Sequence, residues 1–418
     1  MYSAAGAVLA LSATANAGII IPAGEWTLDI NGNVNAYYQN TRHSGGSTAI
    51  TGGINYVQGT GRDATGDNRA EGINTGLLPA WIGFTGKTRQ NDLDVEFTIS
   101  IQPGVSENSV TGDGAVNASG YGGSRTTVLN RQTYLSFGDK SWGSIKLGKD
   151  LGVFGSDAIL SDMTLLGVGA GGGLSGSMDN TTLGGIGSGY IYAAWKGQIA
   201  YTTPNWNGFQ ATAALVNPNM IPDAQGSAGL TPVSLNQDRL GVEGKASYSF
   251  AANDVTGKAW AGFASYDVTQ RGGSATTSNS YTIKAYEAGV NVKSGNLGLT
   301  GYAYTGDGLG TTFMGFLGAN SSGRTRDSNG GYLQATYVIP TGTKLGLGYG
   351  VSNLDNVAGD SGALVEKNRR YTVGAYHPLT KHLNLVAEYN DVNIEAQDNA
   401  VARDQKARNV SLGAILFF

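Results

Sequence analysis

Few residues in this sequence could carry out catalysis or hold a metal ion. The chain contains no cysteine, which excludes a thiolate site and a disulfide framework. Its three histidines are His43, His377 and His382, and the last two flank a His-Pro-Leu-Thr-Lys-His turn whose spacing matches no metal-binding motif. Because histidines at loop edges support no Ser/His/Asp arrangement either, we expect no catalytic site, no metal and no cofactor.

A long segment at residues 150–188 is the most informative part of the chain outside the strands. It is poor in lysine and arginine, and it carries Asp157, Asp162 and Asp179. Its glycine run at 167–172 is similar to a phosphate-binding GxGxxG pattern, but it follows no helix-forming segment, so flexibility explains it better. Loops of this length are uncommon unless they are functional or disordered. A functional loop and a solvated outer loop both remain possible.

The composition favours membrane-spanning strands. Charged residues make up 14% of the chain, against roughly 25% in soluble globular domains. No run of about 18 apolar residues occurs, so no transmembrane helix is available. Low charge without such a run is typical of strands that alternate apolar and polar residues. The net charge is −4 and no basic stripe exists, so we expect no nucleic-acid partner.

Residues 1–17 are predicted to be a secretory signal peptide. An apolar core at 4–11 is followed by Ala15-Asn16-Ala17, an A-x-A cleavage site. No lysine or arginine precedes the core, so the amino-terminal region is atypical or the true start lies upstream. A short hydrophobic strand is the alternative, but the stretch lacks alternation with period two. Residues 18–418 are then one exported barrel domain.

From Trp26 onward, two alternating stretches are joined by a very short turn and followed by a long polar loop, again and again. This layout is expected of bacterial outer-membrane barrels. We predict sixteen strands and seven tight turns. The predicted strands cover residues 27–39, 80–87, 93–102, 129–137, 144–149, 190–201, 209–216, 239–250, 256–268, 281–292, 297–305, 331–338, 343–352, 370–376, 383–392 and 407–418.

The last predicted strand shows the alternation most clearly. Its apolar face consists of Val410, Leu412, Ala414, Leu416 and Phe418. Its other face carries Asn409, Ser411 and Gly413, although Ile415 and Phe417 interrupt the polarity. Lipid permits only closed sheets, so the apolar face of so many strands is expected to point outward. Sixteen strands would enclose an aqueous channel rather than a packed core.

Several motifs resemble those of the general porins of Gram-negative bacteria. The segments NRQTYL at 130–135 and WGSIKLGK at 142–149 resemble the strand, tight turn and strand that lead into the family's third external loop. YTTPNWNGF at 201–209 is similar to the family's Y-x-S-P-x-F-x-G-F turn, and IGFTG at 82–86 to its I-G-F-K-G. Phe418 is similar to the terminal aromatic that serves as the insertion signal. The resemblance covers the whole mature chain in layout.

The resemblance implies a fold and a function. The expected fold is all-β: a sixteen-stranded antiparallel transmembrane β-barrel with short periplasmic turns, long external loops and an inward-folded third loop. The expected function is passive diffusion of ions and small hydrophilic solutes through a homotrimer embedded in outer-membrane lipid. Acidic groups on the third loop would face basic groups on the wall, and such opposed charges create a transverse field.

The residues of this constriction carry over in part. Asp162 stands where the family's loop has an acidic residue, and Asp157 is a second candidate. On the wall, Arg131 and Lys149 match basic positions, and Lys196 is a nearby but unaligned substitute.

Other positions depart from the family's pattern, so we expect fewer basic residues in this cluster than the family usually has. Trp81 replaces an expected arginine, Asn33 replaces a basic residue, and the family's P-E-F-G-G segment is absent. Arg131 also shares parity with Leu129 and Leu135, so alternation does not place it inside. Alternation gives further lumen candidates besides Trp81, namely Arg239, Glu243, Lys245, Glu287, Arg370 and Glu388.

Two other functions remain open. A substrate-selective porin for a sugar or an organic acid would line its constriction with an aromatic track, for which Trp81, Tyr134 and Tyr332 are candidates. The long outer loops would also suit a surface adhesin or a structural envelope protein. The sequence does not decide which solute permeates or whether cations or anions are preferred.

Overall fold

The computed structural model describes residues 18–46, 48, 50–54, 69–105, 128–170, 181–218, 233–236, 239–272, 278–320 and 322–418. The predicted signal peptide at 1–17 lies outside the described residues, as does Asp179. Within the described ranges, no helix is long and apolar enough to cross a membrane.

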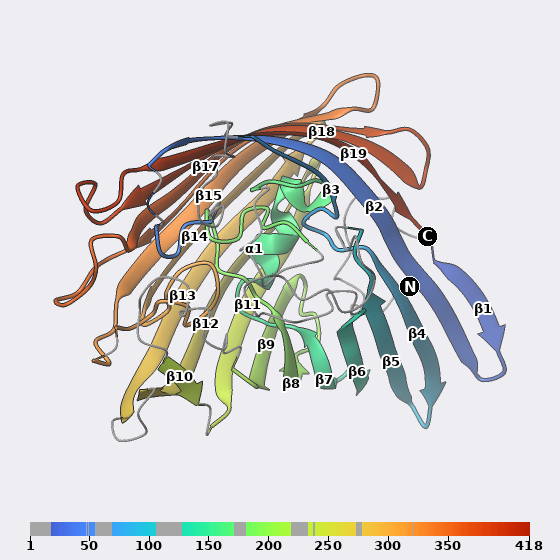
Figure 1. Ribbon diagram of the computed structural model, residues 1–418. Helices are drawn as coiled ribbons and strands as arrows, with labels where there is room; N and C mark the ends of the chain where they lie inside the picture. Colours follow the sequence, from blue (N-terminus) through green and yellow to red (C-terminus); the bar gives the residue numbers. More distant parts are fainter. Residues whose placement is uncertain are drawn as a thin grey trace.

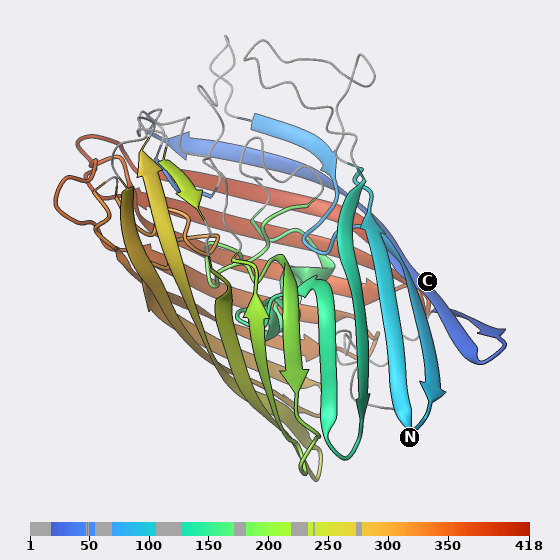
Figure 2. The same ribbon diagram turned by 90° about the horizontal axis from the view of Figure 1, so that it is seen from below.

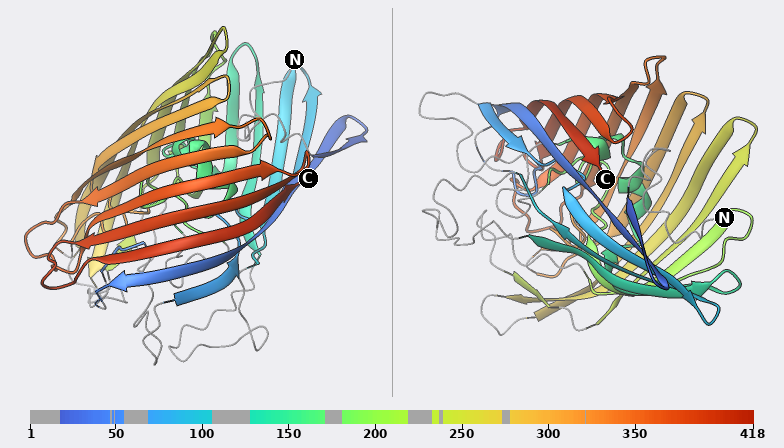
Figure 3. Two further views of the ribbon diagram at one scale, coloured as in Figure 1. Left: turned by 90° about the horizontal axis from the view of Figure 1, so that it is seen from above. Right: turned by 90° about the vertical axis from the view of Figure 1, so that its right-hand side faces the viewer.

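Sixteen antiparallel strands form a closed barrel, which confirms the predicted fold class. Each strand pairs with its neighbour in sequence order, and the last, β19, pairs with β2 to close the ring. Figure 3 shows β19 in red lying beside β2 in blue. The strands are β2 (Trp26–Gly45), β4 (Trp81–Gln90), β5 (Leu93–Gln102), β6 (Leu129–Asp139), β7 (Gly143–Leu151), β8 (Trp195–Thr202), β9 (Phe209–Val216), β11 (Gly241–Ala252), β12 (Val255–Gly272), β13 (Ser278–Ser294), β14 (Leu297–Asp307), β15 (Asp327–Val338), β16 (Lys344–Leu354), β17 (Val365–Pro378), β18 (Leu383–Ala396) and β19 (Gln405–Phe417).

Three short strands lie outside this ring of sixteen and were not predicted. β1 (Ile19–Ala23) forms a hairpin with the start of β2 and projects beyond the barrel (Figure 1). β3 (Arg69–Asn74) pairs with the far half of β2, and β10 (Val233–Asn236) pairs with the end of β12. These strands lengthen the wall at its edges without changing its closure.

Tight turns join the strands at one end of the barrel. Asn91 and Asp92 connect β4 to β5 with φ values of 49° and 62°. Two consecutive residues in the left-handed region make the twist of the turn match that of the flanking strands, and Asn and Asp tolerate this region better than most residues. A polar two-residue turn therefore fixes the register of this hairpin.

Burial follows the alternation along the strands. In β19, the outward Leu412 is 53% exposed whereas the neighbouring Ser411 is 1% exposed. Ile415, which interrupts the polar face, is fully buried and belongs to the apolar cluster inside the barrel. This apolar residue on the inner face is therefore explained by packing against other apolar side chains inside the barrel.

The closing seam includes Phe418. Its backbone N–H donates to the Gly32 carbonyl at 3.1 Å, and its own carbonyl accepts from the Gly32 N–H at 2.8 Å. The last residue thus continues the pairing of β19 with β2. Its role as an insertion signal stays a prediction.

One predicted strand is shorter than expected. The stretch at 190–201 was predicted as a single strand, but β8 begins only at Trp195. Ala194 has a φ of 57°, which breaks the extended chain at this point. Tyr190 and Ile191 are fully buried and belong to the preceding loop.

Candidate pore constriction

The described parts of the segment between β7 and β8, residues 152–170 and 181–194, lie inside the barrel, and we call them the inner loop. Figures 1 and 2 show its helix α1 (Ser156–Ser161) enclosed by the ring of strands. The short 3-10 helix η2 (Met163–Leu166) follows it. Within residues 152–170, only Leu160 and Ser161 are not buried. The inner loop is therefore packed against the wall over nearly all of its described length.

Three glutamates of the wall hold the inner loop by its backbone. They are Glu243 on β11, Glu287 on β13 and Glu388 on β18, all predicted from alternation to face the lumen. The N–H donors are Val153 at 2.6 Å and Phe154 at 3.0 Å to Glu243, Gly155 at 3.0 Å to Glu287, and Val168 at 3.0 Å and Gly169 at 2.8 Å to Glu388. Backbone N–H groups satisfy buried carboxylates and form strong charge-assisted bonds with them. These carboxylates therefore anchor the loop rather than lining water.

Side chains of the wall complete the same bonding. Tyr302 donates to Glu287 at 2.8 Å, and Tyr376 donates to Glu388 at 2.7 Å. Lys196 lies 2.5 Å from Glu243, and the Lys196 side chain is 1% exposed. Lys196 is thus inside the barrel, but a buried ion pair neutralises it and removes it from the water-facing wall.

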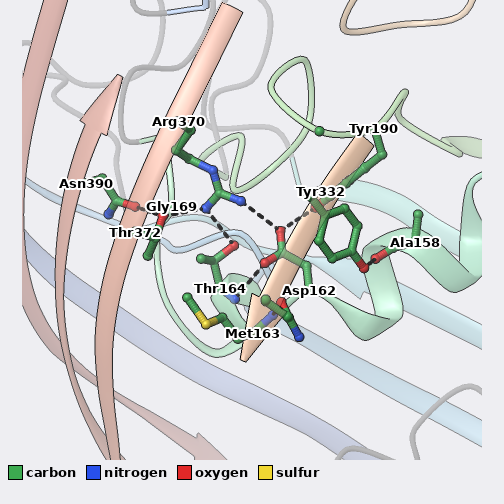
Figure 4. A network of polar contacts seen from close by, with 12 residues as sticks. Ala158, Asp162, Met163, Thr164, Gly169, Tyr190, Tyr332, Arg370, Thr372 and Asn390 are labelled. Atoms are coloured by element: carbon green, nitrogen blue, oxygen red, sulfur yellow. Dashed lines mark hydrogen bonds and ion pairs between the residues drawn. The ribbon is translucent and has the colours of Figure 1, made fainter. Parts of the chain in front are cut away.

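Asp162 joins the inner loop to β17 (Figure 4). Its carboxylate accepts from the Thr164 N–H at 2.9 Å, which caps η2, and from the Tyr190 hydroxyl at 2.9 Å. Arg370 lies 3.5 Å away, and its guanidinium also donates to Thr372 at 2.9 Å. Burial and the Asp162 carboxylate raise the pKa of Tyr190 far above its ordinary value, so this phenol remains a donor.

Asp157 joins the inner loop to β11 and β12. Its carboxylate contacts the ammonium groups of Lys245, at 2.6 Å, and of Lys258. Burial alone would raise the pKa of Asp157, but the two lysines outweigh it and hold the pKa below its ordinary value. Lys258 was missed from the sequence, although it shares its inward parity with Trp260 on β12.

Arg131 points into the barrel because β6 contains a bulge. Ser100 pairs with Gln132 and Ile101 pairs with Asn130, which leaves Arg131 as an extra residue. Such a bulge lets two consecutive side chains face the same side, and both Arg131 and Gln132 are buried. The parity argument from the sequence failed here since it assumed an unbroken ladder.

Two indole rings enclose the Arg131 guanidinium. Its central carbon lies 4.6 Å from the ring centre of Trp81 and 4.2 Å from that of Trp195. Arg131 also donates to the side-chain oxygen of Gln132 at 2.6 Å. Trp81, which replaces an expected arginine, therefore holds a neighbouring arginine flat against the wall by cation–π contact.

Lys149 does not lie on the inner wall, contrary to the prediction. Strand alternation puts Lys146 and Asp150 on the inner face of β7, where they form an ion pair, and puts Lys149 on the other face. The Lys149 ammonium donates to the exposed Asn130 carbonyl at 2.7 Å. The basic residue that β7 contributes to the lumen is Lys146.

Arg239 is also absent from the constriction. It precedes β11, its side chain is exposed, and it lies 3.3 Å from Asp267 at the rim. Among the described residues, no group of three or more His, Asp or Glu side chains could hold a metal ion.

A second segment folds inward, at residues 308–319 after β14. Leu309, Met314 and Leu317 are buried there, and the Tyr192 N–H of the inner loop donates to the Thr312 carbonyl at 3.0 Å. The apolar run LGTTFMGFL at 309–317 was the available signal in the sequence. This segment covers one side of the inner loop.

The comparison with protein families decides the identity. A sequence model of the family described as Gram-negative porin matches residues 3–397. The chain belongs to the Gram-negative porin family. With this fold and family, it is an outer-membrane β-barrel channel. A search of curated proteins found no match.

Solved structures similar to this porin share its fold at low sequence identity. The outer-membrane channel DcaP of Acinetobacter baumannii is 16% identical, with a TM-score of 0.66, 95% of this chain and 99% of that chain covered. An anion-selective porin from Comamonas acidovorans is 16% identical, with a TM-score of 0.58 and coverages of 94% and 100%. A trimer form of OmpT from Vibrio cholerae is 13% identical, with a TM-score of 0.52 and coverages of 94% and 99%.

Proposed function

We propose that this porin is a water-filled diffusion channel for ions and small hydrophilic solutes, and that the inner loop forms its narrowest section. A sixteen-stranded wall is too wide for its own side chains to fill. The observation that carries the proposal is the anchoring of the inner loop to β11, β13 and β18 through Glu243, Glu287 and Glu388. Anchors on strands spread around the wall hold the loop across the lumen.

Charged side chains at this section come from both the loop and the wall. Asp157 and Asp162 belong to the loop, whereas Lys245, Lys258 and Arg370 belong to the wall. These groups touch one another instead of facing each other across water. Contact pairs produce a weaker field in the surrounding water than separated charges do, because the two fields largely cancel with distance. We expect the pairs to fix the loop and to influence selectivity through whichever partner keeps contact with water.

We propose that the channel assembles as a homotrimer in outer-membrane lipid after export through a signal at residues 1–17. The trimer form of the similar OmpT from Vibrio cholerae supports this assembly. The mass of the detergent-solubilised protein, measured by light scattering, tests it. A mass of one chain would contradict the trimer.

Conductance in planar bilayers tests the proposed function. The purified protein should give stepwise openings whose current rises linearly with voltage and salt without saturation. Block or saturation by one sugar or acid would instead support a substrate-selective porin. Tyr332, one candidate for an aromatic track, is buried and donates to the Ala158 carbonyl of the inner loop at 2.7 Å, so its ring offers little surface to a passing solute. Absence of conductance would overturn both the diffusion channel and the substrate-selective porin, and would leave a surface adhesin or a structural envelope protein.

A further inference from the structure

We propose that the charge facing water in the constriction is positive, and that the pore binds and passes small anions, carboxylates included, in preference to cations. This inference rests on the proposed function, and it names the solute class of the same passage.

Five carboxylates inside the barrel are bonded to protein donors. Glu243, Glu287 and Glu388 accept backbone N–H groups of the inner loop, and all three side chains are buried. Asp162 is enclosed by Thr164, Tyr190 and Arg370, and Asp150 is bonded to Gln132 and Lys146. A carboxylate with its lone pairs so used and its surface covered has little to offer a passing cation.

Three lysines of the inner wall, unlike the buried Lys196, keep their contact with water. The side chains of Lys258, Lys146 and Lys245 are 36%, 30% and 17% exposed, whereas those of their partners Asp157 and Asp150 are 9% and 3% exposed. Lys344 on β16 shares the inward face and is half-buried, with its ammonium 4.8 Å from the ring centre of Tyr376. No ion pair involving Lys344 is found in the described part of the chain. In each pair the cation thus faces the lumen and the anion faces the protein.

Asp157 shows that this wall accepts a carboxylate. Lys245 and Lys258, on adjacent strands, contact the two oxygens of that one group, at 2.6 Å for Lys245. Lysine is a compact, strongly hydrated charge on a flexible stem, so its remaining donors can turn toward a solute carboxylate. The contact stays weak because it is made in water, which permits release as well as entry.

Two carboxylates on the inward face of β5, Asp94 and Glu96, must be weighed against this sum. The Asp94 side chain is 43% exposed, but Arg89 lies 2.7 Å from it and is 48% exposed, so this pair adds little net charge. Glu96 on β5 faces the lumen with 14% of its side chain exposed, but Lys87 lies 3.6 Å from it and Tyr134 donates to it at 3.1 Å. The Lys87 side chain is 51% exposed. This pair too presents more of its cation than of its anion.

Reversal potentials across a gradient of potassium chloride, and then of potassium acetate, test the inference. We expect an anion-to-cation permeability ratio above one for both salts. Lys258→Gln should lower the ratio about two- to threefold, since one charge within several ångströms of the path is removed. Asp157→Asn should raise it by a similar factor because it frees both lysines.

Lys149→Gln is the matched control, for it removes a lysine from the outer face of β7 and should leave the ratio unchanged. A ratio of one or below, no response to Lys258→Gln, or an equal response to Lys149→Gln would overturn the inference. A conducting but cation-preferring channel would leave the proposed function standing. Absence of conductance would refute both. The opposite signs expected for Lys258→Gln and Asp157→Asn separate selectivity from general damage to the fold.

Discussion

Replacing Asp162 with Asn should loosen the inner loop without unfolding the barrel. Asparagine keeps one oxygen for the Thr164 N–H, which now donates to Oδ1 at 2.9 Å. It places an NH2 group where Oδ2 now accepts from the Tyr190 hydroxyl at 2.9 Å, and it removes the charge beside Arg370. Removing one partner of a buried ion pair commonly costs about 3–5 kcal/mol, and the 3.5 Å separation from Arg370 favours the lower end. Since a tenfold change in equilibrium corresponds to about 1.4 kcal/mol, about 3 kcal/mol would raise the open population of the loop roughly 100-fold.

Hydrogen exchange of the loop backbone amides measures this opening. The amides of Thr164, Val168 and Gly169 should exchange about 100-fold faster in Asp162→Asn, while strand amides should be unchanged. A double variant, Asp162→Asn with Arg370→Gln, removes both charges and should recover most of the protection, because no buried charge is then left unpaired. Unchanged exchange in the single variant, or a double variant as unprotected as the single one, would refute the reasoning.

Three further outcomes are expected. Arg131→Gln should lower the thermal unfolding midpoint in detergent, because two cation–π contacts of about 1–2 kcal/mol each are lost, whereas Lys149→Gln should not; equal midpoints for the two would contradict this. The pKa of Asp157 is lowered, so its ion pairs are fully present above the ordinary carboxyl pKa of about 4 and are lost only as the pH falls below it. The anion-to-cation permeability ratio should therefore stay flat from neutral pH to about pH 5 and rise under stronger acid. In Asp157→Asn that rise should vanish, and a titration near neutral pH would speak against the assignment. Phe418→Ala should reduce the amount of folded protein in outer-membrane fractions, and an unchanged amount would remove its role as an insertion signal.

The barrel was predictable from the sequence because lipid imposes a period of two on every strand. β5 and β9 begin and end at the residues that the pattern indicated, since turns rich in Asn, Asp and Gly bound them. The beginning of β8 was not predictable, for Tyr190 and Ile191 are as apolar as strand residues yet pack inside the lumen. Periodicity reports which residues avoid water and not which surface covers them.

The constriction was predictable only to the level of single side chains. Alternation gave the inward side of Glu243 and Glu388, but their partners are backbone N–H groups of a loop distant in sequence, which no pattern encodes. Arg131 depended on a bulge that shifts the ladder by one residue. Lys149 was assigned by motif position, although the same alternation that identifies Lys146 as inward excludes it.

The narrowing of the pore by the inner loop can be measured most directly at Ser161. The natural chain has no cysteine, and Ser161 is one of two residues in 152–170 that are not buried, so Ser161→Cys provides a single reactive thiol at the proposed narrowest section. A charged methanethiosulfonate added to single channels in a bilayer should lower the conductance of Ser161→Cys and leave that of Lys149→Cys unchanged. Complete labelling of Ser161→Cys by mass spectrometry with no change in conductance would show that solutes do not pass beside the inner loop.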